Sequence, residues 1–245
     1  MKIIKVKNYD EMNAKALELM VDRINMRENP VLGLATGSTP EGLYQGFIQE
    51  YKQGNVSFKN VITFNLDEYT GLEKDDPNSY YFFMNEKLFR HIDIAKERVH
   101  IPSGTAADLK RECWEYERAI EQAGGIDIQV LGVGENGHIG FNEPGSSFSS
   151  KTHIVDLAES TIQANARYFE SIDKVPKRAI SMGIQTIMNS KEILLLISGE
   201  AKAGVVAKLL SEEISEELPV SVLKEHMNVT AIIDEAAFKG ALALV

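Results

Sequence analysis

The stretch "IDIQVLGVGENGHIGFNEPG", residues 126–145, decides the fold, because an apolar run typical of a buried strand leads directly into a glycine-rich loop. The loop contains the spacing G-x-G-x-x-G, which dinucleotide-binding turns share. Such a turn has to run straight into a helix, whereas Gly140, Pro144 and Gly145 follow here and favour a loop. No well-placed acidic residue follows about 20 residues on to hold a ribose. The stretch therefore predicts a strand and a bent loop, and it argues against a nucleotide site.

Four further short runs of Val, Leu and Ile suit strands that are covered on both faces. They lie at 31–35, 61–66, 193–197 and 229–233. Stretches with helical periodicity lie between the runs, for example at 11–26 and 108–125. This alternation predicts one α/β domain over residues 1–245, with a mostly parallel central sheet and helices on both faces. Ligands of such sheets bind outside the carboxyl ends of the strands, so the residues that follow each run are the candidates for function.

Composition narrows the class of protein. The 245 residues are 44% hydrophobic and 25% charged, which is typical of a soluble globular chain long enough for one core. A net charge of -10 argues against sequence-independent nucleic-acid binding, which depends on Lys and Arg. The single cysteine, Cys113, excludes an intramolecular disulfide, and we interpret it as a semi-buried helix residue. The first residues lack the apolar core of a signal peptide and the run at 193–197 is too short for a membrane span, so we expect a cytoplasmic protein.

Two of the strand ends offer groups that suit a phosphate. After the first run, Gly37, Ser38 and Thr39 place main-chain amides and hydroxyls at the start of a predicted helix. A capped turn without a ligand explains this segment equally well. After the fourth run, Lys202 falls in the first turn of a helix, where the helix dipole disfavours a cation unless an anion lies nearby; a surface lysine is the alternative. Arg167 is a further possible phosphate partner, because guanidinium matches phosphate geometry.

Two other strand ends offer groups that suit proton transfer. Asp67 ends the second run and is placed to act as a general base, although a helix or turn cap explains the segment when it is read alone. The bent loop holds Asn136, His138 and Glu143 near one another. A carboxylate or amide beside one histidine nitrogen sets the tautomer for acid–base work at the other. A structural histidine is the alternative, and a metal site is disfavoured because His138 and Glu143 lack a helical i, i+4 spacing.

The chain resembles the bacterial-type glucosamine-6-phosphate deaminase family over nearly its whole length. The matching stretches are "GLATGSTPEGLY", "FNLDEYTGL", "DDPNSYYFFMN", "GVGENGHIGFNEPGSSF", "QANARYF", "AISMGIQTI" and "LLLISGEAKA". The resemblance implies a modified Rossmann-like fold of the sugar-phosphate isomerase type without a nicotinamide cofactor. It implies a small-molecule sugar phosphate as the partner and the reaction of D-glucosamine 6-phosphate with water to D-fructose 6-phosphate and ammonia. No metal or organic cofactor is implied, since ring opening and enolisation need only proton transfers.

The resemblance also implies roles for individual residues. Asp67 corresponds to the base that moves a proton between C2 and C1 of the sugar. His138 corresponds to the group that opens the sugar ring, with Glu143 and Asn136 orienting it. The phosphate contacts of the family fall on Gly37, Ser38, Thr39, Arg167 and Lys202.

Two departures from the family pattern concern tuning and regulation. Some members carry aspartate at the position of Asn136, so a charged relay is not available here and we expect Glu143 to carry more of the tuning of His138. Members activated by N-acetylglucosamine 6-phosphate carry basic residues where this chain has His153 and Val155, and they extend further at the C-terminus. We therefore expect an enzyme without the activator site, as a monomer or small homo-oligomer. We also expect the polar segment 151–178 to act as a lid.

Two alternative functions stay open on the sequence. A 6-phosphogluconolactonase shares the fold and a histidine-bearing loop, but its loop resembles G-H-x-A-S-L-F-P and lacks a counterpart of Glu143. A sugar-phosphate sensor of the bacterial repressor type carries a helix-turn-helix domain and a basic surface, whereas this chain is acidic. An ammonia-release assay with glucosamine 6-phosphate separates these functions.

Overall fold

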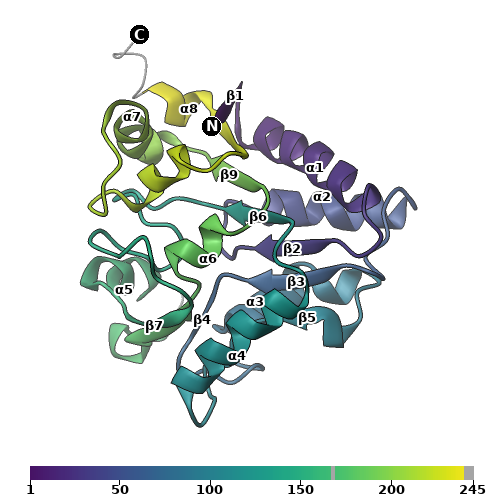
Figure 1. The fold of residues 1–245 in the computed structure, drawn as a ribbon, viewed down its shortest axis with the longest axis horizontal. Helices are drawn as coiled ribbons and strands as arrows, with labels where there is room; N and C mark the ends of the chain where they lie inside the picture. Colours follow the sequence, from purple (N-terminus) through teal and green to yellow (C-terminus); the bar gives the residue numbers. More distant parts are fainter. Residues whose placement is uncertain (167–168, 240–245) are drawn as a thin grey trace.

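A seven-stranded parallel sheet forms the centre of the protein in the computed structural model, which describes residues 1–166 and 169–239 (Figure 1). In spatial order its strands are β1 (Lys2–Val6), β10 (Val229–Asp234), β9 (Ile193–Ile197), β6 (Ile128–Leu131), β2 (Val31–Leu34), β3 (Ile62–Asn65) and β5 (Val99–His100). The prediction of a mostly parallel central sheet is confirmed. The two edge strands β1 and β5 were not predicted, because lysines interrupt the apolar residues of β1 and β5 has only two residues.

Helices cover both faces of this sheet (Figure 1). One face carries α1 (Tyr9–Asn25), α2 (Glu41–Lys52) and α3 (Tyr80–Lys87). The other carries α4 (Leu109–Gln122), α6 (Ile184–Met188), α7 (Ala203–Ser211) and α8 (Glu235–Phe238). The remaining helical segments are α5 (Glu159–Asn165) and the 3₁₀ turns η1 (Phe89–His91), η2 (Lys96–Arg98), η4 (Ile172–Lys174), η5 (Glu200–Lys202) and η6 (Pro219–Lys224).

The helix α1 shows how sequence periodicity becomes packing. Met12, Ala16 and Met20 recur every fourth residue and are fully buried against the sheet, since that spacing places them on one face of a helix. The side chain of Asn8 caps the helix by accepting a hydrogen bond from the amide of Glu11 at 3.0 Å. The same periodicity places Cys113 on α4, as the sequence predicts, and the residue is buried there and not semi-buried.

A second, antiparallel sheet contains β4 (Asp67–Tyr69), β8 (Arg178–Ser181) and β7 (His153–Asp156). It was not predicted, because β3 and β4 are separated only by Leu66 and together look like one strand in the sequence. The amide of Leu66 donates to Leu34 in the large sheet, whereas its carbonyl accepts from Met182, next to β8. The chain thus passes from one sheet to the other at Leu66, which places Asp67 at the junction.

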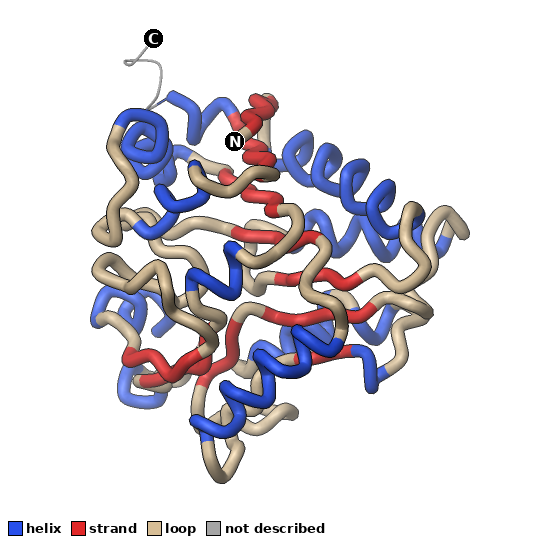
Figure 2. The backbone as a smooth tube through the Cα atoms, viewed as in Figure 1, coloured by secondary structure: helices blue, strands red, loops and turns tan. Residues whose placement is uncertain are grey.

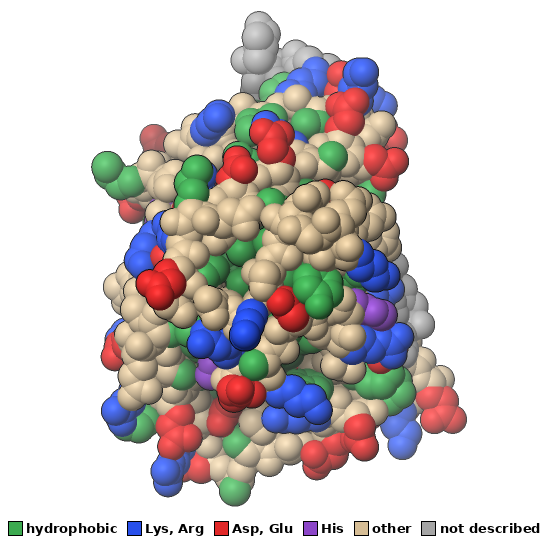
Figure 3. Space-filling view, turned by 90° about the vertical axis from the view of Figure 1, so that its right-hand side faces the viewer, with side chains coloured by type: hydrophobic (Ala, Val, Ile, Leu, Met, Phe, Trp, Pro, Cys, Tyr) green, Lys and Arg blue, Asp and Glu red, His purple; other side chains and the backbone are tan. Residues whose placement is uncertain are grey.

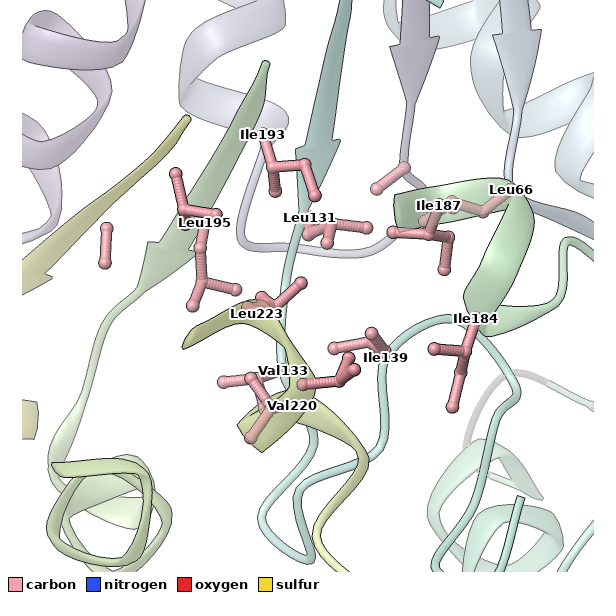
Figure 4. Close-up of a cluster of buried hydrophobic side chains, with 14 of the residues drawn as sticks. Leu66, Leu131, Val133, Ile139, Ile184, Ile187, Ile193, Leu195, Val220 and Leu223 are labelled. Atoms are coloured by element: carbon pink, nitrogen blue, oxygen red, sulfur yellow. The ribbon is translucent and has the colours of Figure 1, made fainter. Parts of the chain in front are cut away.

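The loop after β6 is fixed by a hydrophobic cluster below it. Figure 4 shows Val133 and Ile139, which flank the loop, beside Val220 and Leu223, both of η6. Figure 2 shows that loops, drawn in tan, continue from β2, β3 and β6 toward the same side of the molecule. The buried anchors therefore hold the ends of the loop while its polar middle projects beyond the sheet.

The face of the molecule that Figure 3 presents is mixed in charge. Figure 3 shows Lys and Arg side chains interspersed with Asp and Glu on the face that it presents. Among the described helices, none combines the length and the apolar character that a membrane crossing needs.

Candidate active site

A cavity of about 510 Å³ opens where the strands of the large sheet end. Its walls come from the segments after β2, β3, β6 and β9, together with side chains of α3 and α5. The lining residues are Ala35, Thr36, Thr39, Pro40, Leu66, Asp67, Tyr80, Gly132, Val133, Gly134, Glu135, Asn136, His138, Gly140, Phe141, Thr161 and Lys202. The parallel neighbours β2 and β6 lie where the strand order reverses, because the next strand of the large sheet after β2 is β3 on one side and the next after β6 is β9 on the other. Open α/β sheets bind ligands at this position.

Asp67 is the buried acid of this cavity. Only 7% of the residue is exposed, and burial raises the pKa of its carboxyl group to about 8, with the neighbouring charge of Glu68 adding to the shift. A carboxyl group with a pKa near neutrality can both take up and release a proton at physiological pH. The environment of Asp67 therefore suits acid–base chemistry.

The capping role that the sequence left open for this segment belongs to Glu68. Its carboxylate accepts hydrogen bonds from the first amides of α3, those of Tyr80 and Tyr81, at 2.9 Å each. Burial raises the pKa of Glu68, and these amide hydrogen bonds oppose the shift. Because Glu68 satisfies the helix terminus, Asp67 is left to face the cavity.

Asn136, His138 and Glu143 form one hydrogen-bonded set. The amide nitrogen of Asn136 donates to Glu143 Oε2 at 2.6 Å, and its oxygen lies 2.7 Å from His138 Nδ1. His138 Nδ1 is also 3.5 Å from Glu143 Oε2. Both neighbouring oxygens are acceptors, so Nδ1 carries the proton and Nε2 is the basic nitrogen of the neutral ring. Asn136 thus serves as a neutral bridge between the carboxylate and the histidine.

Glu143 is the ionised member of this set. Half burial would raise the pKa of its carboxyl group, but hydrogen bonds with His138, Thr161 and Asn136 and the charge of His138 lower it to about 2. The hydroxyl of Thr161 donates to Glu143 Oε1 at 2.7 Å. The set therefore keeps a fixed negative charge beside the histidine, which stabilises the ring when it takes up a proton.

Two glycines allow the loop to approach the site so closely. A Cβ atom at Gly134 would lie 2.2 Å from the ring of His138, so only glycine leaves room for that ring. At Gly140 the backbone has a φ of +57°, in the left-handed region that favours glycine, and a Cβ there would lie 3.2 Å from Ser181 Oγ. The buried amide of Asn142 fastens this part of the loop by donating to the carbonyls of Ile139 and Met182, both at 2.8 Å.

The candidate phosphate residues fall into three groups. Thr39 and Lys202 line the cavity, and Lys202 ends η5 directly before α7. Burial lowers the pKa of Lys202, while the charge of Glu135 opposes that shift. Gly37 and Ser38 lie exposed on the same loop as Thr39 but do not line this cavity. Arg167 lies outside the described residues.

Several lining residues were missed by sequence reasoning. Tyr80 enters from α3 and lies against Phe141, with ring centroids 6.2 Å apart. Thr161 enters from α5, which is part of the segment 151–178 that we predict to be a lid. Tyr80 lies in the matching stretch "DDPNSYYFFMN", but no spacing within it singles this residue out, and Thr161 lies in none of the matching stretches. Each residue reaches the cavity through the packing of its helix.

Comparisons with known proteins agree on one family. The family model for glucosamine-6-phosphate isomerases and 6-phosphogluconolactonases matches residues 6–232. The curated glucosamine-6-phosphate deaminase of Oceanobacillus iheyensis is 57% identical over 98% of this chain and 96% of its own length. A solved monomeric glucosamine-6-phosphate deaminase has a TM-score of 0.95 at 54% identity, covering 97% of this chain and 99% of that one. The 6-phosphogluconolactonase of Trypanosoma brucei shares the fold, with a TM-score of 0.79 at 20% identity over 100% and 98% of the two chains.

Proposed function

The chain belongs to the family of glucosamine-6-phosphate isomerases and 6-phosphogluconolactonases, and on this premise we propose that it is a deaminase of amino-sugar catabolism. The reaction converts D-glucosamine 6-phosphate and water into D-fructose 6-phosphate and ammonia. The observation that carries the assignment of residues is that Asp67 and the Asn136–His138–Glu143 set line or adjoin one cavity. High identity to deaminases, against 20% to the lactonase, selects the deaminase within the family.

The first step that the geometry supports is opening of the sugar ring. His138 Nε2 takes the proton from the hydroxyl on C1 and returns it to the ring oxygen, so that the C1 aldehyde forms. Glu143 and Asn136 hold the ring of His138 and stabilise the charge that it gains.

The second step is a proton transfer by Asp67. Its carboxylate takes the proton from C2 of the open sugar, which leaves a double bond between C1 and C2. The oxygen on C1 takes up a proton that the ammonium group on C2 gives up, and Asp67 returns its own proton to C1. The amino group is then part of an imine at C2. Water adds to that imine and ammonia leaves, which gives the ketone of fructose 6-phosphate.

The phosphate end of the substrate is assigned to Thr39, Lys202 and the loop amides between Gly37 and Thr39. These amides donate no hydrogen bond within residues 1–166 and 169–239, so they are free to bind an anion. Arg167 stays in the assignment as implied by the resemblance. Proton transfers and an anion site suffice for the reaction, so the proposal requires no metal or organic cofactor.

The protonation of Asp67 can be followed directly. We expect one carboxyl carbon in a ¹³C NMR titration of the free protein to titrate near pH 8, because burial raises the pKa of Asp67 to about 8. The resonance should be absent from the spectrum of Asp67→Asn. A spectrum in which every carboxyl group of the wild type titrates below pH 6 would contradict this environment.

A substrate comparison tests the proposed function. We expect ammonia release from glucosamine 6-phosphate at a rate typical of an enzyme, and hydrolysis of 6-phosphogluconolactone no faster than the uncatalysed reaction. Lactone hydrolysis without ammonia release would identify the chain as a lactonase of the same family. Binding of both compounds without turnover would identify a sensor.

The proposal extends to regulation and assembly. At the two positions where activated members carry basic residues, β7 has His153 and the buried Val155, so these positions supply no pair of permanently charged side chains to the phosphate of an activator. We expect N-acetylglucosamine 6-phosphate to leave the curve of rate against substrate concentration hyperbolic and unshifted, and the protein to act as a monomer or small homo-oligomer. A rise in activity on adding N-acetylglucosamine 6-phosphate would show that the chain does have an activator site.

A further inference from the structure

The loop between β2 and α2, residues 35–40, enters a helix that has no side-chain cap of its own. Asn8, Ser79 and Asp108 cap the helices α1, α3 and α4 with their side chains. Pro40 stands at the corresponding position of α2 and makes no such bond. Because the first amides of a helix find no partner inside it, α2 needs an acceptor from another part of the chain.

Tyr9 supplies that acceptor. Its hydroxyl accepts a hydrogen bond from the amide of Gly42, in the first turn of α2, at 2.9 Å. The same hydroxyl donates to the carbonyl of Ser38 at 2.8 Å. The ring of Tyr9 packs at the start of α1 against the core cluster below α1 and α2. One phenol group therefore joins a helix terminus and the neighbouring loop.

The hydrogen bond to Ser38 also fixes the direction of an amide. The described part of the chain contains no cis peptide bond, so the carbonyl of Ser38 and the N–H of Thr39 point in opposite directions from one peptide plane. With the carbonyl held toward Tyr9, the N–H of Thr39 points away from Tyr9. The residue Thr39 lines the cavity that contains Asp67, and its amide has no acceptor within the described residues.

A second tyrosine holds the beginning of the same loop. The hydroxyl of Tyr44, on α2, donates to the carbonyl of Ala35 at 2.5 Å and is fully buried. Between the two anchors at Ala35 and Ser38, the amides of the loop stay free of partners in the part of the chain that the structure describes. The loop is therefore prepared for an anion by contacts on its carbonyl side.

We infer that Tyr9 is a positioning residue of the phosphate site: its hydroxyl caps α2 and orients the Ser38–Thr39 peptide so that the Thr39 amide meets a phosphate oxygen. The inference rests on the proposed function only in assigning this loop to the phosphate of the sugar. Tyr9 contacts no reacting atom, so it acts on binding and leaves the proton transfers of Asp67 and His138 unchanged.

A purely structural role for Tyr9 makes a different prediction. The helices α1 and α2 already pack against one another through the core cluster that contains Met12, Leu43 and Phe47. If the hydroxyl only joined the helices, its loss would lower the stability of the fold without changing phosphate affinity. The dissociation constant of phosphate and the split between KM and kcat therefore distinguish the two roles.

The test uses Tyr9→Phe, which removes only the hydroxyl. Tyr51→Phe is the matched control, because Tyr51 lies on α2 against the same core cluster and its hydroxyl makes no hydrogen bond within the described residues. Binding of inorganic phosphate is measured by calorimetry without turnover, and KM and kcat are measured by ammonia release. In Tyr9→Phe, we expect the Kd of phosphate and the KM each to rise by about threefold to tenfold, the net effect of one hydrogen bond, with kcat kept within about twofold.

The outcomes separate this inference from the proposed function. Unchanged phosphate affinity in Tyr9→Phe, an equal loss in Tyr51→Phe, a fall in kcat alone, or failure of only Tyr9→Phe to fold would overturn the positioning role. A wild-type protein that binds no phosphate would overturn it as well. If the wild type binds phosphate but releases no ammonia, the proposed function fails, and the calorimetric comparison still decides the role of Tyr9.

Discussion

Asp67→Asn is expected to lower the kcat of ammonia release by about 10³-fold, because asparagine fills the same space but takes up no proton from C2. The loss should appear in kcat and not in the affinity for phosphate, since the candidate phosphate groups lie on Thr39 and Lys202. Asp75→Asn is the matched control, because Asp75 is exposed and the substitution makes the same aspartate-to-asparagine change away from the cavity. Near-normal kcat in Asp67→Asn would remove Asp67 from the mechanism.

The same substitution has a consequence for stability whose sign is fixed by the pKa. The pKa of Asp67 is raised from 3.8 to about 8 in the folded state, so the contribution of this group to stability is fully present below pH 3.8 and is lost as the pH rises from there through 8. Asparagine carries no charge at any of these pH values. The Tm of the wild type should therefore fall more steeply than that of Asp67→Asn between pH 5 and 8, and the two curves should become parallel above that range, as measured by calorimetry. Parallel curves of Tm against pH for the two proteins within that range would indicate that burial does not raise the pKa of Asp67.

His138→Gln is expected to lower kcat by about 10²-fold, because ring opening then loses its proton carrier. Asn136 and Glu143 would remain bonded to each other, so the loop should keep its fold. His153→Gln is the matched control, since His153 Nδ1 lies 2.8 Å from the carbonyl of Lys151 and outside the Asn136–His138–Glu143 set.

The measurement is steady-state ammonia release, with phosphate binding as the check on folding and on the anion site. We expect phosphate affinity within about twofold of the wild type, because His138 belongs to the opposite end of the proposed substrate. Activity of His138→Gln close to that of the wild type would assign ring opening to another group. Equal losses in His138→Gln and His153→Gln would point to a general effect of losing a histidine.

The sequence predicted the convergence of the site because the topology of parallel sheets dictates it. Strand ends of one parallel sheet meet at one edge, so Asp67, His138 and Lys202 share a cavity although they are far apart in the chain. The bent loop was predictable for the same kind of reason, since its glycines and Pro144 exclude a helix. These predictions depend only on local chemistry and on the direction of strands.

Other features depend on contacts that no local pattern encodes. The second sheet escaped prediction because Leu66 bonds to both sheets through its own amide and carbonyl, and the apolar run does not show that change of partner. Thr161 and Tyr9 reach their positions through the packing of α5 and α1. The sequence contains other threonines and tyrosines, and no local pattern distinguishes these two from the rest. The assignments of residues 151–178 as a lid and of Arg167 as a phosphate contact stay predictions.

The structure sharpens the role of Asn136. The sequence indicated that an amide there gives up a charged relay, so that Glu143 carries more of the tuning of His138. The amide in fact bonds to both, donating to Glu143 and accepting from His138. The charge of Glu143 therefore acts on His138 across 3.5 Å, while Asn136 fixes the orientation of both groups.

Product analysis of the wild-type reaction tests the central claim most directly. If Asp67 moves a proton from C2 to C1 before the amine leaves, the wild type must release fructose 6-phosphate and ammonia from glucosamine 6-phosphate in equal amounts, with no added metal or cofactor. Enzymatic determination of both products in the same sample measures this ratio. Ammonia accompanied by an aldose phosphate, or no ammonia at all, would contradict the proton transfer that the buried carboxyl group of Asp67 is proposed to perform.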